Sequence, residues 1–151
     1  MSDRLPGSVL FCCTMNSVRS PMAEGILKAL YPKQVFVDSA GVRKQPVDPL
    51  AVEVMDEIGL DISKHRSKTF DDLEDSSFDL IISLSPEAQH SAVDMTRTMA
   101  CDVEFWNTFD PTIVEGTREQ RLEAYREVRD GLMKRIRARF VRPTASAGGG
   151  D

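Results

Sequence analysis

The sequence predicts a single α/β domain in which helices cover both faces of a four-stranded parallel sheet. Short β-prone apolar runs alternate with segments of helical periodicity, the pattern of strands joined by crossover helices. The chain of 151 residues fits one domain with a real core, and it contains neither an internal repeat nor a linker. Sheets of this kind bind ligands at the carboxyl ends of their strands.

The first half of the chain provides two strands and two helices. We expect the first strand at residues 8–12, followed by Ser20 and Pro21 as N-cap and first-turn residues of a helix. Apolar residues at three- and four-residue spacing continue this helix until Pro32. A second strand is expected at residues 35–39 and a second helix at 50–58, with Gly59 at its C-terminal end.

The second half repeats the alternation. A third strand is expected at residues 78–84, a short helix at 86–95 and a fourth strand at 103–106. A long closing helix is expected over 117–140, with one apolar face. The tail, residues 143–151, is small and glycine-rich and is predicted to be disordered, which leaves residues 1–142 as the domain.

Composition excludes several classes of function. A net charge of −5 argues against a sequence-independent nucleic-acid binder. No apolar run is long enough to cross a membrane, and the N-terminus does not read as a signal peptide. Three cysteines, two of them adjacent, favour a cytoplasmic protein without a disulfide framework. With only two histidines and no ligand spacing, the sequence predicts no metal.

The residues between the first strand and the first helix carry the chemistry. Cys13 and Arg19 are separated by five residues, so the intervening backbone N–H groups can curl around an anion. The helix N-terminus favours a thiolate there, and Arg19 can hold two oxygens of a phosphoryl group in a bidentate fork. Ser20 can donate a hydrogen bond to the thiolate. The remaining loop residues are Thr14, Met15, Asn16, Ser17 and Val18. The sequence thus predicts a site for a phosphate-shaped oxyanion, attacked by Cys13 without a cofactor.

The loop sequence CTMNSVRSP resembles the signature of the low-molecular-weight protein tyrosine phosphatases and the related thioredoxin-coupled arsenate reductases. The similarity covers nearly the whole chain and includes residues 38–41, 58–63 and the pair Asp110-Pro111. This family has a four-stranded parallel sheet flanked by helices. The resemblance implies that Cys13 is the nucleophile, Arg19 the oxyanion clamp, and Asp110 the general acid and later the base. It also implies a network that holds the loop in shape, formed by Asn16, Ser39 and His65.

The sequence departs from the family pattern at several places. Met15 stands where the family usually has glycine, and because a methionine resists positive φ, the backbone is expected to be arranged differently there. Val18 replaces the second loop cysteine. Thr112 and Ile113 replace the tyrosines that form the cleft wall in phosphotyrosine-specific members. The region that carries the resolving cysteines of the reductases has Ser85 and Ala92, and Cys101 nearby is expected to be a spectator.

Three functions remain open. The first is a metal-independent phosphatase that hydrolyses phosphotyrosine in proteins, or small aryl phosphates, through a phosphocysteine. The alternative is an arsenate reductase that uses an external small thiol. The third is a non-catalytic module that binds phosphoproteins. In each, inorganic phosphate or arsenate is an expected ligand, and neither nucleic acid nor a membrane is an expected partner. Asp110 argues against the third, and the absence of a resolving pair favours the first over the second.

Overall fold

The structure is a computed structural model that describes residues 5–74 and 77–141. The predicted tail, residues 143–151, lies outside the described residues, as does the last residue of the predicted domain. None of the helices in the described part of the chain is long and apolar enough to cross a membrane.

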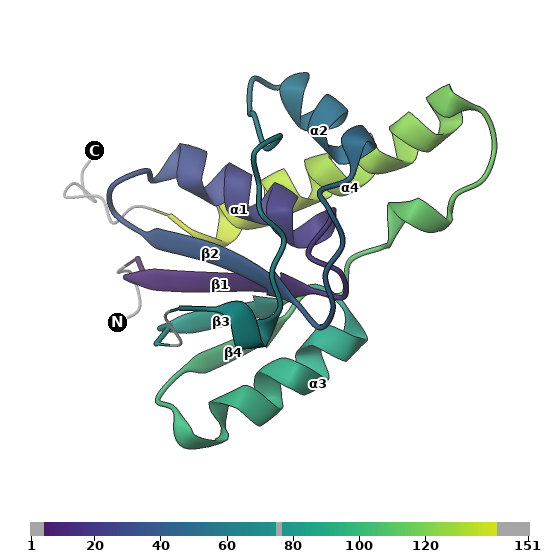
Figure 1. The fold of residues 1–151 in the computed structure, drawn as a ribbon. Coiled ribbons are helices and arrows are strands. Elements are labelled where there is room, and N and C mark those ends of the chain that lie inside the picture. The colour runs from purple at the N-terminus through teal and green to yellow at the C-terminus, as the bar shows by residue number, and fades with distance from the viewer. Residues whose placement is uncertain (1–4, 75–76, 142–151) are drawn as a thin grey trace, which may run out of the picture.

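The sheet has four parallel strands, which confirms the predicted fold class. β1 (Ser8–Cys13) lies at the centre between β2 (Phe36–Gly41) and β3 (Leu80–Ser83), and β4 (Asp102–Phe105) completes the order β2-β1-β3-β4 (Figure 1). The chain passes from β1 to β2 on one side of it, and from β2 it then crosses back over β1 to β3 on the other side, so the direction of the connections reverses at β1. This reversal is the switch point at which open α/β sheets bind ligands.

The helices form one layer on each face of the sheet. α1 (Arg19–Leu30), α2 (Pro49–Asp56) and α4 (Arg118–Arg139) lie on one face, and α3 (Pro86–Met95) covers the other (Figure 1). Both helix layers pack against the central strand β1, because successive side chains of a strand point to opposite faces of the sheet. Its two faces are filled by different core clusters, one with Val9, Phe11 and Cys13 and one with Leu10 and Cys12.

Most boundaries lie within two residues of those predicted. α3 has the predicted bounds. It begins at Pro86 because Ser85, as N-cap, accepts a hydrogen bond from Ala88 N. α4 begins after the capping box of Thr117 and Gln120. β1 and β2 continue to Cys13 and Gly41, one and two residues beyond their predicted ends. Short 3₁₀ turns lie at Phe70–Asp72, Thr96–Thr98 and Pro111–Ile113.

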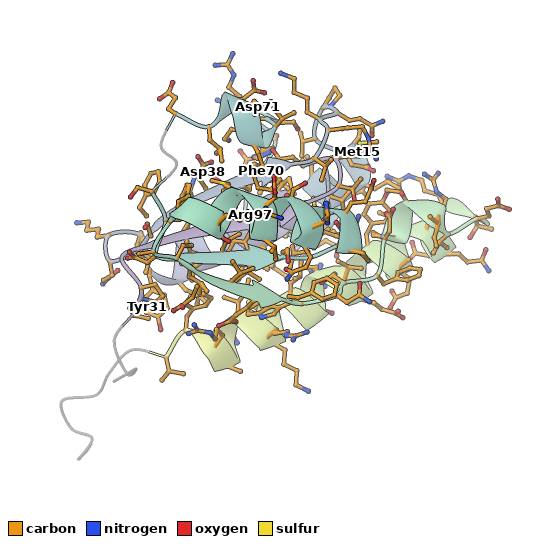
Figure 2. The ribbon with its side chains drawn as sticks, turned by 90° about the horizontal axis from the view of Figure 1, so that it is seen from below. Met15, Tyr31, Asp38, Phe70, Asp71 and Arg97 are labelled. Atoms are coloured by element: carbon orange, nitrogen blue, oxygen red, sulfur yellow. The ribbon has the colours of Figure 1, made fainter. Side chains whose placement is uncertain are left out.

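The loop between β1 and α1 lies at the carboxyl edge of the sheet. Met15 of this loop is at the opposite end of the molecule from Tyr31, which follows α1 (Figure 2). The predicted site is therefore located where parallel sheets present their ligand sites.

Candidate active site

Cys13 and Ser20 form the centre of the loop. Cys13 is 2% exposed, and its Sγ lies 2.9 Å from the Oγ of Ser20. Asn16 Nδ2 donates to the same Oγ at 2.8 Å. This bond occupies a lone pair of the Ser20 oxygen and leaves the single hydroxyl proton of Ser20 for Cys13. The hydroxyl of Ser20 can therefore donate to the Cys13 sulfur.

The prediction that Ser20 caps α1 is wrong. The helix begins at Arg19, with Val18 in the N-cap position and no side-chain cap. The reason is that the hydroxyl of Ser20 is already held between Cys13 and Asn16. The first N–H groups of α1 therefore have no side-chain acceptor and remain available to an anion in the loop.

Asn16 is the fully buried residue around which the loop is built. It has a φ of 53°, the one positive φ among non-glycine residues in the described part of the chain. The loop therefore places its positive φ at Asn16, and asparagine is a residue type that tolerates this conformation. Met15, where the family usually has glycine, does not adopt a positive φ. Its Nδ2 also donates to Ser39 Oγ at 2.9 Å, and its Oδ1 accepts from Lys68 N at 2.9 Å.

His65 and Ser39 complete the network around Asn16. His65 Nε2 lies 3.0 Å from Asn16 Oδ1 and must be the donor, since that oxygen can only accept. Ser39 Oγ donates to Glu24 Oε1 at 2.6 Å, and His65 Nδ1 lies 3.5 Å from the same oxygen. Burial lowers the pKa of His65, against the opposing effect of the Glu24 carboxylate. Glu24, in the helix that follows the loop, was not predicted.

Arg19 connects the loop to the segment after β4. Its side chain is 10% exposed, and its Nη1 donates to the carbonyl of Thr108 at 3.0 Å. Its Nη2 lies 3.9 Å from Asp110 Oδ2. The other carboxylate oxygen of Asp110 accepts from the backbone N–H and the hydroxyl of Thr112, at 3.0 and 2.7 Å. Cys13, Arg19 and Asp110, far apart in sequence, thus line one cavity.

This cavity has a volume of about 520 Å³. Its lining contains no aromatic side chain from the described part of the chain, but it includes three residues that the sequence analysis did not assign to the site, Gln45, Asp48 and Glu87. Asp48 is fixed by Leu50 N at 2.8 Å and by the Tyr125 hydroxyl at 2.7 Å. The Asp-Pro pair that begins α2 is an N-cap signal from which Asp48 could have been noticed.

The segment after β2 holds the backbone of the loop. Val42, Arg43 and Gln45 donate their backbone N–H groups to the carbonyls of residues 13, 14 and 15, at 3.2, 2.8 and 3.1 Å. Gly41 permits this approach, because a Cβ there would lie 2.7 Å from Asn16 N.

The described residues provide no second thiol to the cavity. Ser85 is buried and accepts a hydrogen bond from the Thr14 hydroxyl at 3.0 Å, and Ala92 is fully buried. Cys12 lies in the cluster on the α3 side, where burial raises its pKa. Cys101 precedes β4 and packs partly against that same cluster. In residues 5–74 and 77–141, no three His, Cys, Asp or Glu side chains are grouped as metal ligands.

The fold and this loop define the class of protein. Residues 8–141 match the family of low molecular weight phosphotyrosine protein phosphatases, and the chain belongs to that family. The chain is 38% identical over 131 residues to an arsenate reductase of Halalkalibacterium halodurans, an alignment that covers 85% of this chain and 91% of the relative. It is 32% identical over 134 residues to a glutaredoxin arsenate reductase of Synechocystis, covering 85% and 92%.

Solved structures show the same fold with both activities in their names. An arsenate reductase in the phosphate binding state superposes with a TM-score of 0.70 at 30% identity, covering 91% of this chain and 98% of the other. A low molecular weight protein tyrosine phosphatase of T. tengcongensis superposes with a TM-score of 0.71 at 32% identity, covering 85% and 94%.

Proposed function

We propose that the protein reduces arsenate with electrons from an external thiol, through an arsenic adduct on Cys13. The observation that carries the proposal is the lining of the cavity. Cys13 and Arg19 face a space to which the described residues contribute no aromatic wall, and such a space suits a small inorganic oxyanion better than the ring of a phosphotyrosine. The relatives named as arsenate reductases support the same substrate.

The chemistry needs two sulfur atoms for one arsenic atom. The Cys13 thiolate attacks arsenate, and one oxygen leaves as water after protonation, which gives a Cys13–S–As(V) adduct. An external thiolate then attacks the sulfur of Cys13. The S–As bond breaks with its electron pair on arsenic, so arsenite leaves and a mixed disulfide remains. A second external thiol releases Cys13 and forms the small-molecule disulfide.

The thiol is external in this proposal because of where the other cysteines lie. Cys12 is on the opposite face of β1, and Cys101 is not in the lining of the cavity. In the region after the third strand, where the resembled reductases carry their resolving cysteines, this chain has Ser85 and Ala92.

A second candidate, hydrolysis of phosphomonoesters through a phosphocysteine, is favoured by Asp110. Its Oδ2 faces Arg19 at the mouth of the cavity, and its side chain is 38% exposed, so it can reach a leaving oxygen and a water molecule. A module that only binds phosphoproteins has no use for this carboxylate.

One pair of assays on the same preparation separates these functions. Arsenite formation is measured with glutathione, other small thiols, and glutaredoxin with glutathione, and hydrolysis is measured with p-nitrophenyl phosphate. We expect thiol-dependent arsenite formation that is abolished in Cys13→Ser and unaffected by a chelator. Hydrolysis without arsenite formation for every thiol source would leave the phosphatase as the function. Asp110→Asn would then slow esters with poor leaving groups by roughly 10²–10⁴-fold.

A further inference from the structure

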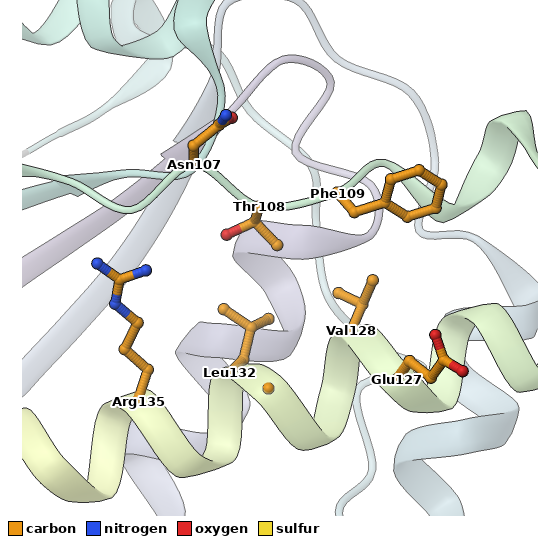
Figure 3. Close-up of a pocket in the computed structure, with 8 residues that line it drawn as sticks. Asn107, Thr108, Phe109, Glu127, Val128, Leu132 and Arg135 are labelled. Carbon is orange, nitrogen blue, oxygen red and sulfur yellow. The ribbon is translucent and has the colours of Figure 1, made fainter.

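A second cavity lies between α4 and the segment that links β4 to Asp110. Its volume is about 360 Å³, and Figure 3 shows its lining residues. Residues 107–109 form one wall, and Val128, Gly131 and Leu132 of α4 form the floor. Glu127 and Arg135 lie at its two ends, about 12 Å apart at the rise of an α-helix. We call this cavity the α4 groove.

Gly131 keeps the floor of the α4 groove open. A glycine inside a helix destabilises it by about 1 kcal/mol relative to alanine. Packing explains such a residue in α1, where a Cβ on Gly25 would lie 3.0 Å from Ile62. It does not explain Gly131, because a Cβ there would meet no atom within 4 Å. The missing side chain therefore leaves space that no neighbour fills.

Arg135 places an uncommitted cation at one end. Its guanidinium carbon lies 4.9 Å from the centre of the Trp106 ring, which holds the side chain beside the groove. Within the described residues, its N–H groups make no hydrogen bond or ion pair, and the same holds for the side-chain amide of Asn107. In Figure 3 the guanidinium extends from α4 at the end of the groove opposite Glu127, where its N–H groups can donate to an anionic acceptor.

The other end sets a limit on the charge of a ligand. Glu127 carries a carboxylate there, below the ring of Phe109, which is 55% exposed (Figure 3). A second negative group at this end would face that carboxylate. The groove therefore combines one anion site, an apolar floor and an exposed aromatic edge.

We propose that the α4 groove binds a small organic monoanion, a carboxylate or sulfonate with an aromatic or aliphatic body. The anionic group bonds to Arg135, and the body lies over Gly131 and Leu132 toward Phe109. This site is separate from the oxyanion cavity, and its existence does not depend on which reaction Cys13 performs. It shares a wall with the clamp, however, because the carbonyl of Thr108 accepts the hydrogen bond from Arg19.

The test uses the fluorescent monoanion 8-anilinonaphthalene-1-sulfonate as probe. We expect one dye per chain. Arg135→Gln should weaken its binding about tenfold or more, as expected for the loss of a charge-assisted hydrogen bond. Arg137→Gln removes the same charge from an exposed position of the same helix and should change binding less than twofold. Glu127→Gln should leave binding unchanged or tighten it.

Gly131→Leu fills the floor and should also weaken dye binding about tenfold or more, while thermal unfolding shows a helix at least as stable as in the wild type. Equal losses in the Arg135 and Arg137 variants would overturn the proposal. Wild-type affinity in a folded Gly131→Leu protein would do so as well. Strictly competitive displacement by inorganic phosphate would place the dye in the Cys13 cavity and also refute the site. If Gly131→Leu fails to fold, the arginine pair decides alone.

Discussion

Replacing Asn16 by alanine removes four hydrogen bonds at once, to Ser20, Ser39, His65 and the backbone of Lys68. At about 0.5–1.5 kcal/mol each, their loss destabilises the protein by roughly 2–6 kcal/mol. Alanine also fits poorly at a φ of 53°. For a domain of this size, we expect the melting temperature to fall by about 8–16 °C for a loss near 4 kcal/mol.

Asn16→Asp separates the scaffold from the chemistry. It keeps an acceptor for His65 and Lys68, but it presents an oxygen to Ser20 where the wild type has an N–H. The hydroxyl of Ser20 must then turn toward position 16, and Cys13 loses its hydrogen bond. We expect this variant to be more stable than Asn16→Ala but to lose about tenfold to a hundredfold in turnover, the value of one charge-assisted bond.

Thermal and urea unfolding, followed by circular dichroism in phosphate-free buffer, measure the loss of stability in Asn16→Ala. Initial rates measure the loss of turnover in Asn16→Asp. Asn107→Ala is the matched control, because Asn107 is the other asparagine of the chain and its side chain is exposed. The reasoning fails if Asn16→Ala lies within 1 kcal/mol of the wild type, taken from the urea curves. It also fails if Asn16→Asp turns over at the wild-type rate.

Three further predictions concern other parts of the site. Gly41→Ala should abolish phosphate binding and destabilise the fold by about 1–3 kcal/mol, because its methyl group overlaps the loop backbone; phosphate binding by calorimetry at the wild-type level would contradict this. Burial lowers the pKa of His65, so stability is full above the ordinary histidine pKa of about 6.5 and declines as pH falls below it. Urea unfolding at pH 7.5 and 5.5 should show this decline in the wild type and in His90→Gln but not in His65→Gln, and an equal decline in all three refutes it. Peroxide should add oxygen to Cys13 without a Cys12–Cys13 disulfide, since the two side chains lie on opposite faces of β1; mass spectrometry that finds this disulfide, with full recovery by a dithiol, would disprove it.

The fold followed from local patterns because the local and tertiary preferences agree. Ser85-Pro86 begins α3 as a cap and first-turn pair should, and the apolar alternation of β1 matches the two layers that cover it. At Ser20 they disagree. Its sequence context is that of an N-cap, but the buried Asn16 and Cys13 use its hydroxyl, and no local pattern reports that competition.

The contacts of Ser39 and His65 with the loop were predicted only through the resemblance to the family. Ser39 and His65 contact Asn16 because β2 and the segment after α2 converge on the loop. Glu24 could not be predicted as their partner, since its position in a helix gives no sign that it faces inward. The α4 groove was also beyond the sequence. It depends on how residues 107–109 pass over α4 and on an absent side chain at Gly131.

The uncapped start of α1 links the ligand to the lifetime of the protein. An oxyanion bound in the loop, as proposed, would accept from the N–H groups that a capping side chain would otherwise satisfy, so the ligand would take the place of a capping residue. Ligand at a hundred times its dissociation constant stabilises the folded state by about 2.7 kcal/mol. The fraction of molecules open to proteolysis then falls by about the same hundredfold. We expect the protein to persist longest in cells rich in the oxyanion that fills its loop.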